Sequence, residues 1–186
     1  MAIAAAAVAP DVATPAAWNE LVFRVLESND NRTLVEVLFP TPHIESVDIQ
    51  GRTFDIVRVP GASPLGRPGQ PLLSVAGTLI AIPPTAGVEL RIIEEGHDVL
   101  RGITPLPART DNWTIDQPLM LDEAAYARKG FSFAQAEVGE PATMRDFRVV
   151  PLRVFPLSYD DAALELRVTR RLVVELDYSS AGRVRI

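Results

Sequence analysis

A strict alternation of apolar and polar residues near the end of the chain is the feature that most limits its fold. Most odd positions between residues 164 and 178 are charged or polar, and only Arg170 and Val173 break the pattern. The even positions are all apolar apart from Arg170: Leu164, Leu166, Val168, Leu172, Val174, Leu176 and Tyr178. Because successive side chains of a strand point to opposite faces, this period of two predicts a long β-strand with one buried and one solvated face.

A second strand is predicted just before it, over residues 147–155, and the two are expected to form a hairpin. The connection contains Tyr159-Asp160-Asp161-Ala162, and aspartate side chains can bond to nearby backbone and tolerate turn conformations. Pro151 and Pro156 lie at the first strand and cannot donate to a ladder. That strand is therefore expected to have a free edge or a bulge at the prolines.

The rest of the chain also favours strands over helices. Proline is frequent, with 16 residues among 186, and proline and glycine interrupt most windows of helix length. Only residues 121–129 fit a helical turn, with Asp122 and Glu123 near its start and Gly130 as a cap. Further β-rich runs cover residues 21–26, 34–39, 44–50, 52–59, 72–83 and 87–93. The sequence predicts an all-β antiparallel β-sandwich of two packed sheets, jelly-roll-like, with at most one short helix.

The chain is predicted to form one domain with short appendages. Residues 1–16 are rich in alanine and lack a basic segment, so we interpret them as a disordered leader or the remnant of a signal peptide. Residues 17–180 form the predicted sandwich, and residues 181–186 a flexible basic tail. A chain of this size can bury a sufficient core without a metal ion, and the absence of cysteine excludes disulfides.

Composition argues against several classes of partner. A net charge of −6 without a lysine or arginine cluster argues against nucleic acid and anionic membranes. No apolar run reaches the length of a membrane span. Two histidines and no cysteine do not make a structural zinc site by themselves, so neither a metal nor another cofactor is expected. The polar residues 27–32 are typical of a hairpin turn, and calcium binding is the alternative for such oxygen-rich clusters.

Two irregular segments stand out between the predicted strands. Residues 61–71 contain three glycines and three prolines, and Gly69 after Pro68 suits the third position of a type II turn. No lysine of a phosphate loop follows these glycines. Residues 104–119 contain three prolines and no periodicity, and loops of this length are usually functional or disordered. This second segment carries Arg109, Asp111 and Trp113.

Three blocks, in order, resemble the N-terminal propeptide of the gingipain-type C25 cysteine peptidases. The first is residues 61–83, with the turn Gly66-Arg67-Pro68-Gly69-Gln70-Pro71, and the second is residues 122–138, centred on Tyr126. The third is residues 144–159, in which arginines, prolines and a final tyrosine recur at fixed spacing before the long alternating strand. The similarity covers approximately residues 45–178.

This resemblance implies a non-catalytic β-sandwich that precedes a caspase-like peptidase domain in the same precursor. Such a propeptide assists folding, keeps the peptidase latent by covering its active-site cleft with a loop, and is removed by cleavage after basic residues. The implied protein is bacterial and is secreted or attached to the cell surface. The absence of cysteine agrees, because the nucleophile of that chemistry cannot lie on this chain.

The resemblance also directs the search for site residues to basic side chains on loops. An arginine can fill an acidic pocket through charge-assisted, bidentate hydrogen bonds. Arg109, with Asp111 and Trp113 in the same loop, is the first candidate for the inhibitory loop, and Arg128 with Lys129 is the second. Arg183 and Arg185, in the basic tail, are candidate processing sites.

Two other functional classes compete with this interpretation. A free-standing adhesion or carbohydrate-binding module is the main alternative, although Trp18, Trp113 and three tyrosines provide few aromatics for sugar stacking. An enzyme with paired carboxylates is disfavoured, because the adjacent Glu94 and Glu95 point to opposite faces of a strand and cannot flank one bond. A caspase-like domain after residue 186 in the precursor would favour the propeptide.

Overall fold

The computed structural model describes residues 20–110, 114, 117–127, 134–178 and 184–185. These residues form thirteen strands and one short helix. The elements, in chain order, are β1 (Val22–Ser28), β2 (Arg32–Leu38), β3 (His43–Ile49), β4 (Arg52–Arg58), β5 (Ser63–Leu65), β6 (Leu73–Ile82), β7 (Val88–Arg101), α1 (Glu123–Tyr126), β8 (Ala136–Val138), β9 (Ala142–Met144), β10 (Phe147–Val154), β11 (Leu157–Asp160), β12 (Glu165–Asp177) and β13 (Val184–Arg185). No helix among them is long and apolar enough to cross a membrane.

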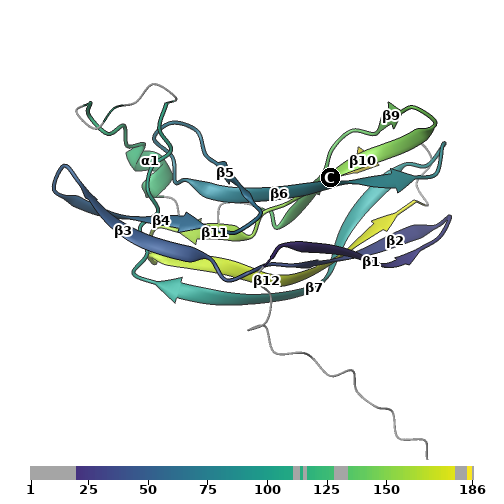
Figure 1. Ribbon diagram of the computed structural model, residues 1–186, viewed down its shortest axis with the longest axis horizontal. Helices are drawn as coiled ribbons and strands as arrows, with labels where there is room; N and C mark the ends of the chain where they lie inside the picture. Colours follow the sequence, from purple (N-terminus) through teal and green to yellow (C-terminus); the bar gives the residue numbers. More distant parts are fainter. Residues whose placement is uncertain (1–19, 111–113, 115–116, 128–133, 179–183, 186) are drawn as a thin grey trace, which may run out of the picture.

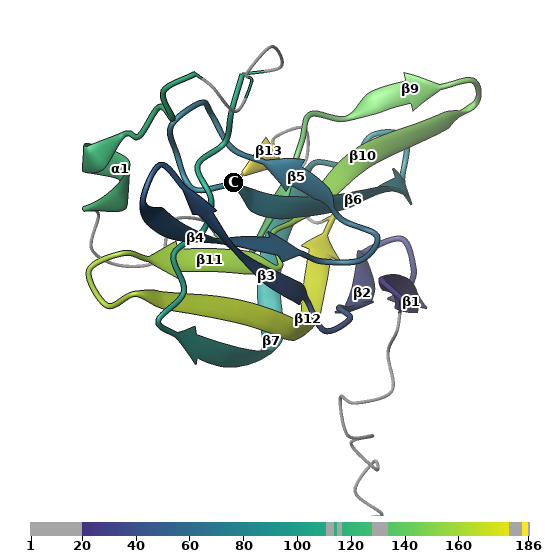
Figure 2. The ribbon, with the colours of Figure 1, turned by 60° about the vertical axis from the view of Figure 1, so that its left-hand side comes forward.

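Two antiparallel sheets form the layers of a sandwich, which confirms the predicted fold class (Figure 1). The six-stranded sheet has the order β1-β2-β12-β7-β13, with β11 also paired to β12. The five-stranded sheet has the order β5-β6-β10-β8, with β9 also paired to β10. The β3–β4 hairpin is a separate two-stranded sheet, which lies at the same end of the molecule as α1 (Figures 1 and 2).

The alternation of the last long strand fills two hydrophobic clusters. Leu172, Val174 and Leu176 are fully buried between the two sheets, with residues of β2, β6 and β10. Leu166 and Val168 lie in a second cluster with Tyr126 and Tyr159. Arg170, which breaks the apolar pattern, is the extra residue of a bulge in the pairing of β12 with β7. The interruption in the sequence pattern therefore marks the point where the strand passes from one cluster to the other.

The prediction that residues 147–155 form a hairpin with the last long strand is wrong. The strand at residues 147–154, β10, pairs with β6 in the other sheet, and the short β11 pairs with β12. The chain changes sheets between them, at Phe155 and Pro156. Pro156 has no N–H for a ladder, but its carbonyl accepts a hydrogen bond from Thr169 N at 2.8 Å. A proline here ends one strand and starts the crossing.

The predicted free edge or bulge at Pro151 takes the form of an interruption in the ladder of β10, and the edge itself is covered. The Pro151 carbonyl accepts from Gly139 N at 2.8 Å, so the proline nitrogen faces the same side of β10. On that side β9 covers Phe147 to Val149 and β8 covers Leu152 to Val154. Pro151 therefore lies in the gap between the two short strands, where no ladder donor is required.

Most other predicted elements are also present. The hairpin β1–β2 forms as expected, and the runs at residues 44–50 and 52–59 pair with each other as β3 and β4. The run at residues 72–83 forms the inner strand β6, and the run at residues 87–93 continues through a bulge to Arg101 as β7. The helix is shorter than predicted, with Asp122 as its N-cap and Ala127 as its C-cap. The boundaries of the leader and the tail stay predictions. Within the predicted tail, the backbone of residues 184–185 forms β13, parallel to the start of β7.

Candidate functional site

The long irregular segment after β7 is anchored to the fold at both of its ends. We refer to residues 104–122 as the clamped loop. Its first residues run beside β4 and the turn after β5, with short bridges between Asp55 and Pro105 and between Pro71 and Pro107. The loop therefore starts as ordered structure, although it has no periodicity in its sequence.

The carboxylate of Asp55 holds the start of the clamped loop. Asp55, on β4, is only 8% exposed. One of its oxygens accepts from Ser46 Oγ at 2.7 Å, and the other accepts from Thr104 N at 2.8 Å. The backbone of Asp55 adds two more bonds, donating to Thr104 O and accepting from Leu106 N. A buried carboxylate with several donors is stable, and it fixes the position where the loop leaves β7.

Gly69 bonds to both arms of the clamped loop, which are residues 104–108 and residues 117–122. Its N–H donates to Ala108 O at 2.9 Å, and its carbonyl accepts from Asp122 N at 2.9 Å. Gly69 has φ +86°, and Gln70 N donates to Arg67 O, as the predicted type II turn requires. A Cβ on Gly69 would lie 3.1 Å from Asp122 N, so only glycine combines this backbone conformation with this close approach.

A second clamp holds the loop near its end. The Gln50 side chain donates to Gln117 O at 2.9 Å and accepts from Leu119 N at 3.3 Å. We refer to the part of the clamped loop between its two held ends, which starts at Arg109, as its tip. Arg109 is exposed at the start of this tip.

Two buried tyrosines lie next to the first residues of the clamped loop. Tyr126 Oη donates to Pro105 O at 2.6 Å, and its ring meets the Tyr159 ring edge-on at 6.4 Å between centroids. Burial raises the pKa of Tyr126, and the charges of Tyr159 and Asp161 raise it further. Burial also raises the pKa of Tyr159, with an additional contribution from its hydrogen bond to Asp161.

These raised pKa values predict alkaline unfolding. The unfolded tyrosines ionise near their ordinary pKa of 10.0, whereas the folded ones stay neutral. Stability is therefore complete below pH 10 and should fall above it, by about 1.4 kcal/mol per pH unit for each tyrosine. Urea unfolding between pH 8 and pH 11 measures this slope. A Tyr126→Phe variant should show a shallower slope, and an unchanged slope would contradict the assignment.

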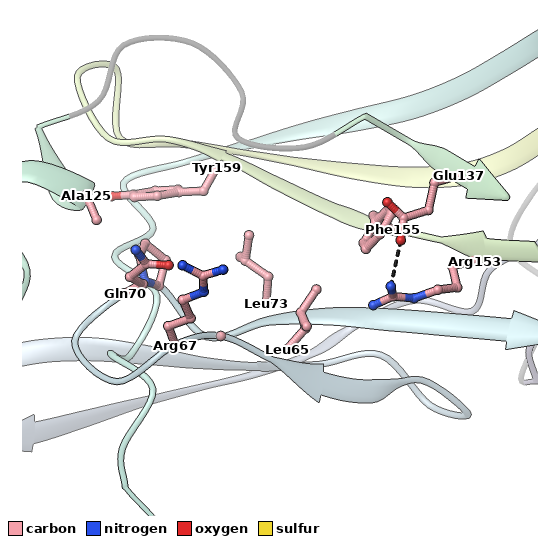
Figure 3. Close-up of a pocket in the computed structure, with 11 residues that line it drawn as sticks. Leu65, Arg67, Gln70, Leu73, Ala125, Glu137, Arg153, Phe155 and Tyr159 are labelled. Carbon is pink, nitrogen blue, oxygen red and sulfur yellow. Dashed lines mark ion pairs between the residues drawn. The ribbon is translucent and has the colours of Figure 1, made fainter. Parts of the chain in front are cut away.

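A cavity lies beside the turn that carries Gly69 (Figure 3). Its volume is about 470 Å³. Leu65, Leu73 and Phe155 contribute its apolar walls, and the Arg153–Glu137 ion pair, at 2.7 Å, closes one end. The cavity therefore lies between the Gly69 turn, which holds the clamped loop, and the end of β10.

The predicted site residues have different outcomes. Arg109 lies on the clamped loop, as described. Asp111, Trp113, Arg128, Lys129 and Arg183 lie outside the described residues. The backbone of Arg185 is paired with Glu89 of β7. The inhibitory and processing roles of all these residues stay predictions.

The residues that hold the loop in place carry little signal in the sequence. Asp55 is an isolated acid in the apolar run Phe54-Asp55-Ile56-Val57, and this exception to the pattern was the available signal. Gln50 gave no signal, because its partners are backbone atoms far away in the sequence. Within the described residues, no three metal-ligating side chains come together. The arrangement is suited to presenting a loop.

Comparison with known proteins identifies the family of this chain. The family model Propeptide_C25 matches residues 19–183. Lys-gingipain of Porphyromonas gingivalis is 30% identical over 157 residues, and the match covers 78% of this chain. It covers only 9% of that relative, so the chain spans a small part of the curated proteins that it matches.

Two solved structures share the fold. One, described as a structural insight into the zymogenic latency of gingipain K from P. gingivalis, has a TM-score of 0.72 and 26% identity, and covers 89% of this chain and 96% of the other. The second is a complex of the RgpB pro- and mature domains from P. gingivalis, with a TM-score of 0.77, 17% identity, and coverage of 88% of this chain and 89% of the other. The chain belongs to the C25 propeptide family and is a non-catalytic propeptide domain.

Proposed function

We propose that this domain keeps the C25-type cysteine peptidase of its own precursor latent and assists its folding. The clamped loop covers the active-site cleft of that peptidase. The observation that carries the proposal is the geometry of the loop, with two fixed arms and an exposed arginine at the start of its tip. The similarity to the gingipain K structure supports the proposal.

The rigid base explains how a loop can inhibit a peptidase. Binding a flexible loop costs conformational entropy, and fixing both arms in advance reduces this cost. Arg109 then enters a pocket that selects basic side chains. The guanidinium forms charge-assisted hydrogen bonds to carboxylates of that pocket. The domain contributes no nucleophile, because it contains no cysteine.

Inhibition in trans tests the proposal. The chain and the C25 peptidase domain of its precursor are expressed separately, and cleavage of fluorogenic arginine and lysine substrates is measured. We expect tight inhibition that follows the concentration of the chain. A precursor without such a peptidase domain, or a peptidase unaffected by a folded chain, would overturn the proposal.

Substitution of Arg109 tests the loop assignment. Arg109→Ala should raise the inhibition constant at least tenfold, because the pocket loses its charged occupant. Arg101→Ala is the control, since Arg101 is 83% exposed and lies at the end of β7. If Arg109→Ala has no effect and the double variant Arg128→Ala/Lys129→Ala does, the second candidate carries the inhibition. If neither changes the constant, the contact lies outside both.

Processing and location complete the proposal. Cleavage after Arg183 or Arg185 releases the propeptide. The N-terminal sequence of the mature peptidase identifies the residue after which cleavage occurs. Cleavage after Arg185 requires β13 to leave the edge of the six-stranded sheet first. The precursor is bacterial and is exported to the medium or the cell surface.

A further inference from the structure

The outer face of the five-stranded sheet is apolar and exposed. Ile80 and Val150 point inward, so their neighbours in β6 and β10 point outward. Phe147 is 67% exposed, Met144 52% and Leu79 51%. We call this surface the apolar face, and its exposed or half-buried members are Gly77, Leu79 and Ala81 of β6, Ala142 and Met144 of β9, and Phe147 and Pro151 of β10. Val149, between the last two, is buried. Contiguous exposed apolar surfaces of this kind commonly mark interaction sites.

The opposite outer face of the molecule has a different character. On the six-stranded sheet, arginine side chains alternate with carboxylates across neighbouring strands. Arg171 of β12 bonds to Glu36 of β2 and to Glu94 of β7. Arg32 and Arg91 both pair with Glu175. These charges are compensated where they lie and keep this face solvated, although β7 also exposes Ile93 (50%) and Val99 (41%).

Charged residues border the apolar face at both ends. Arg145 and Asp146 lie exposed in the turn between Met144 and Phe147. At the other end, Arg153 and Glu137 bond to each other at 2.7 Å beside the cavity. A partner must therefore present an apolar surface to the middle of the face and polar groups to the hairpin turn.

The apolar face and the clamped loop lie on the same side of the molecule. In Figure 1, α1, β5, β6, β9 and β10 follow its upper side, and β7 and β12 follow its lower side. The cavity lies between the turn that holds the loop and β10, because Arg67 and Gln70 of that turn line it together with Arg153 (Figure 3). The β9–β10 hairpin extends beyond the end of β6 and carries Met144 and Phe147 outward (Figure 2).

We propose that the apolar face is the surface on which the peptidase domain of the same precursor docks. This inference rests on the proposed function. A loop that enters a cleft brings the adjoining surface of the domain against the rim, and on this side that surface is the apolar face. Burial of Leu79, Met144 and Phe147 against an apolar patch then supplies affinity that the loop alone does not provide. Attachment within one precursor raises the effective concentration of the two domains and favours this partner over a second copy of the chain.

Aspartate substitutions in the full chain test the inference. Leu79→Asp and Phe147→Asp each place a charge in the proposed contact and should raise the inhibition constant in trans at least tenfold. Val99→Asp is the matched control, because Val99 is 41% exposed and faces outward on β7 opposite Arg167. All three variants change exposed side chains, so their urea unfolding midpoints should stay near that of the parent chain. Phe147→Ser is a milder second variant for the case in which an aspartate disturbs the hairpin.

The outcomes separate this inference from the proposed function. If the parent chain does not inhibit, the proposed function fails. If the parent chain inhibits and the Leu79→Asp, Phe147→Asp and Phe147→Ser variants inhibit equally well, the docking surface is elsewhere and only this inference fails. If the isolated chain sediments as a dimer that the face variants dissociate, the occupant is a second copy and the inference is overturned.

Discussion

A Gly69→Val variant is expected to lose about 3 kcal/mol of unfolding free energy and most of its inhibitory strength. The residue has φ +86°, a region that β-branched side chains almost never occupy, and such strain costs about 1–3 kcal/mol. Its Cβ would also lie 3.1 Å from Asp122 N and 3.5 Å from Asp122 Cβ. Relief of this contact separates Ala108 and Asp122, so the two ends of the clamped loop are no longer held together. Urea unfolding and inhibition in trans measure the two effects.

Gly102 offers a control for the backbone strain alone. It has φ +71°, and nothing lies within 4 Å of a Cβ built on it. Gly102→Val should therefore cost about 1–2 kcal/mol without a change in the inhibition constant once the protein is folded. Equal losses of inhibition in the two variants would show that Gly69 does not act through the clamp.

An Asp55→Ala variant is expected to lose about 2–4 kcal/mol of unfolding free energy. Removal of the carboxylate leaves Thr104 N without its acceptor at a half-buried position, whereas the exposed Ser46 Oγ can bond to water. Hydrogen bonds to charged groups contribute about 1.5–3 kcal/mol each, and an unsatisfied buried donor costs about 1–3 kcal/mol. The start of the clamped loop should also exchange its amide hydrogens faster, which hydrogen exchange at Thr104 and Leu106 detects.

Two milder substitutions test the explanation for Asp55. Asp55→Asn keeps one carbonyl oxygen and the size of the side chain, so it should lose roughly half as much stability as Asp55→Ala. Ser46→Ala removes one bond and leaves the bond to Thr104, so loop exchange should stay slow. Fast exchange in Ser46→Ala would show that β3, and not the carboxylate, holds the loop.

The local elements of this fold were predictable because their signals are local. Alternation over residues 164–178 predicts β12, a polar cluster between two apolar runs predicts the β1–β2 turn, and Pro68-Gly69 predicts its turn type. The pairing of β12 was not predictable in this way. A strand pattern specifies which face is buried but not which strand lies beside it. Proximity in the sequence therefore favours residues 147–155 as the partner, and these residues belong to the other sheet.

The site shows the same division between local and distant information. A long proline-rich segment with an exposed arginine identified the clamped loop as a candidate. The residues that fix it, Asp55, Gln50 and Gly69, act on backbone atoms distant in the sequence. Bonds of this kind leave no periodic trace, because the backbone partner can belong to any residue type.

The place of β12 in the six-stranded sheet determines when this domain can fold during synthesis. β12 lies between β2 and β7, so the β1–β2 hairpin and β7 join one sheet only through residues 165–177. Until the ribosome has released this segment, β2 and β7 each have an unpaired edge, and their apolar side chains lack the buried residues of β12. Chains dominated by such distant pairings fold slowly and are prone to association while they wait. A stalled or truncated product that ends before residue 165 should therefore accumulate as aggregate, and a chaperone that holds nascent apolar strands should raise the yield of the complete domain.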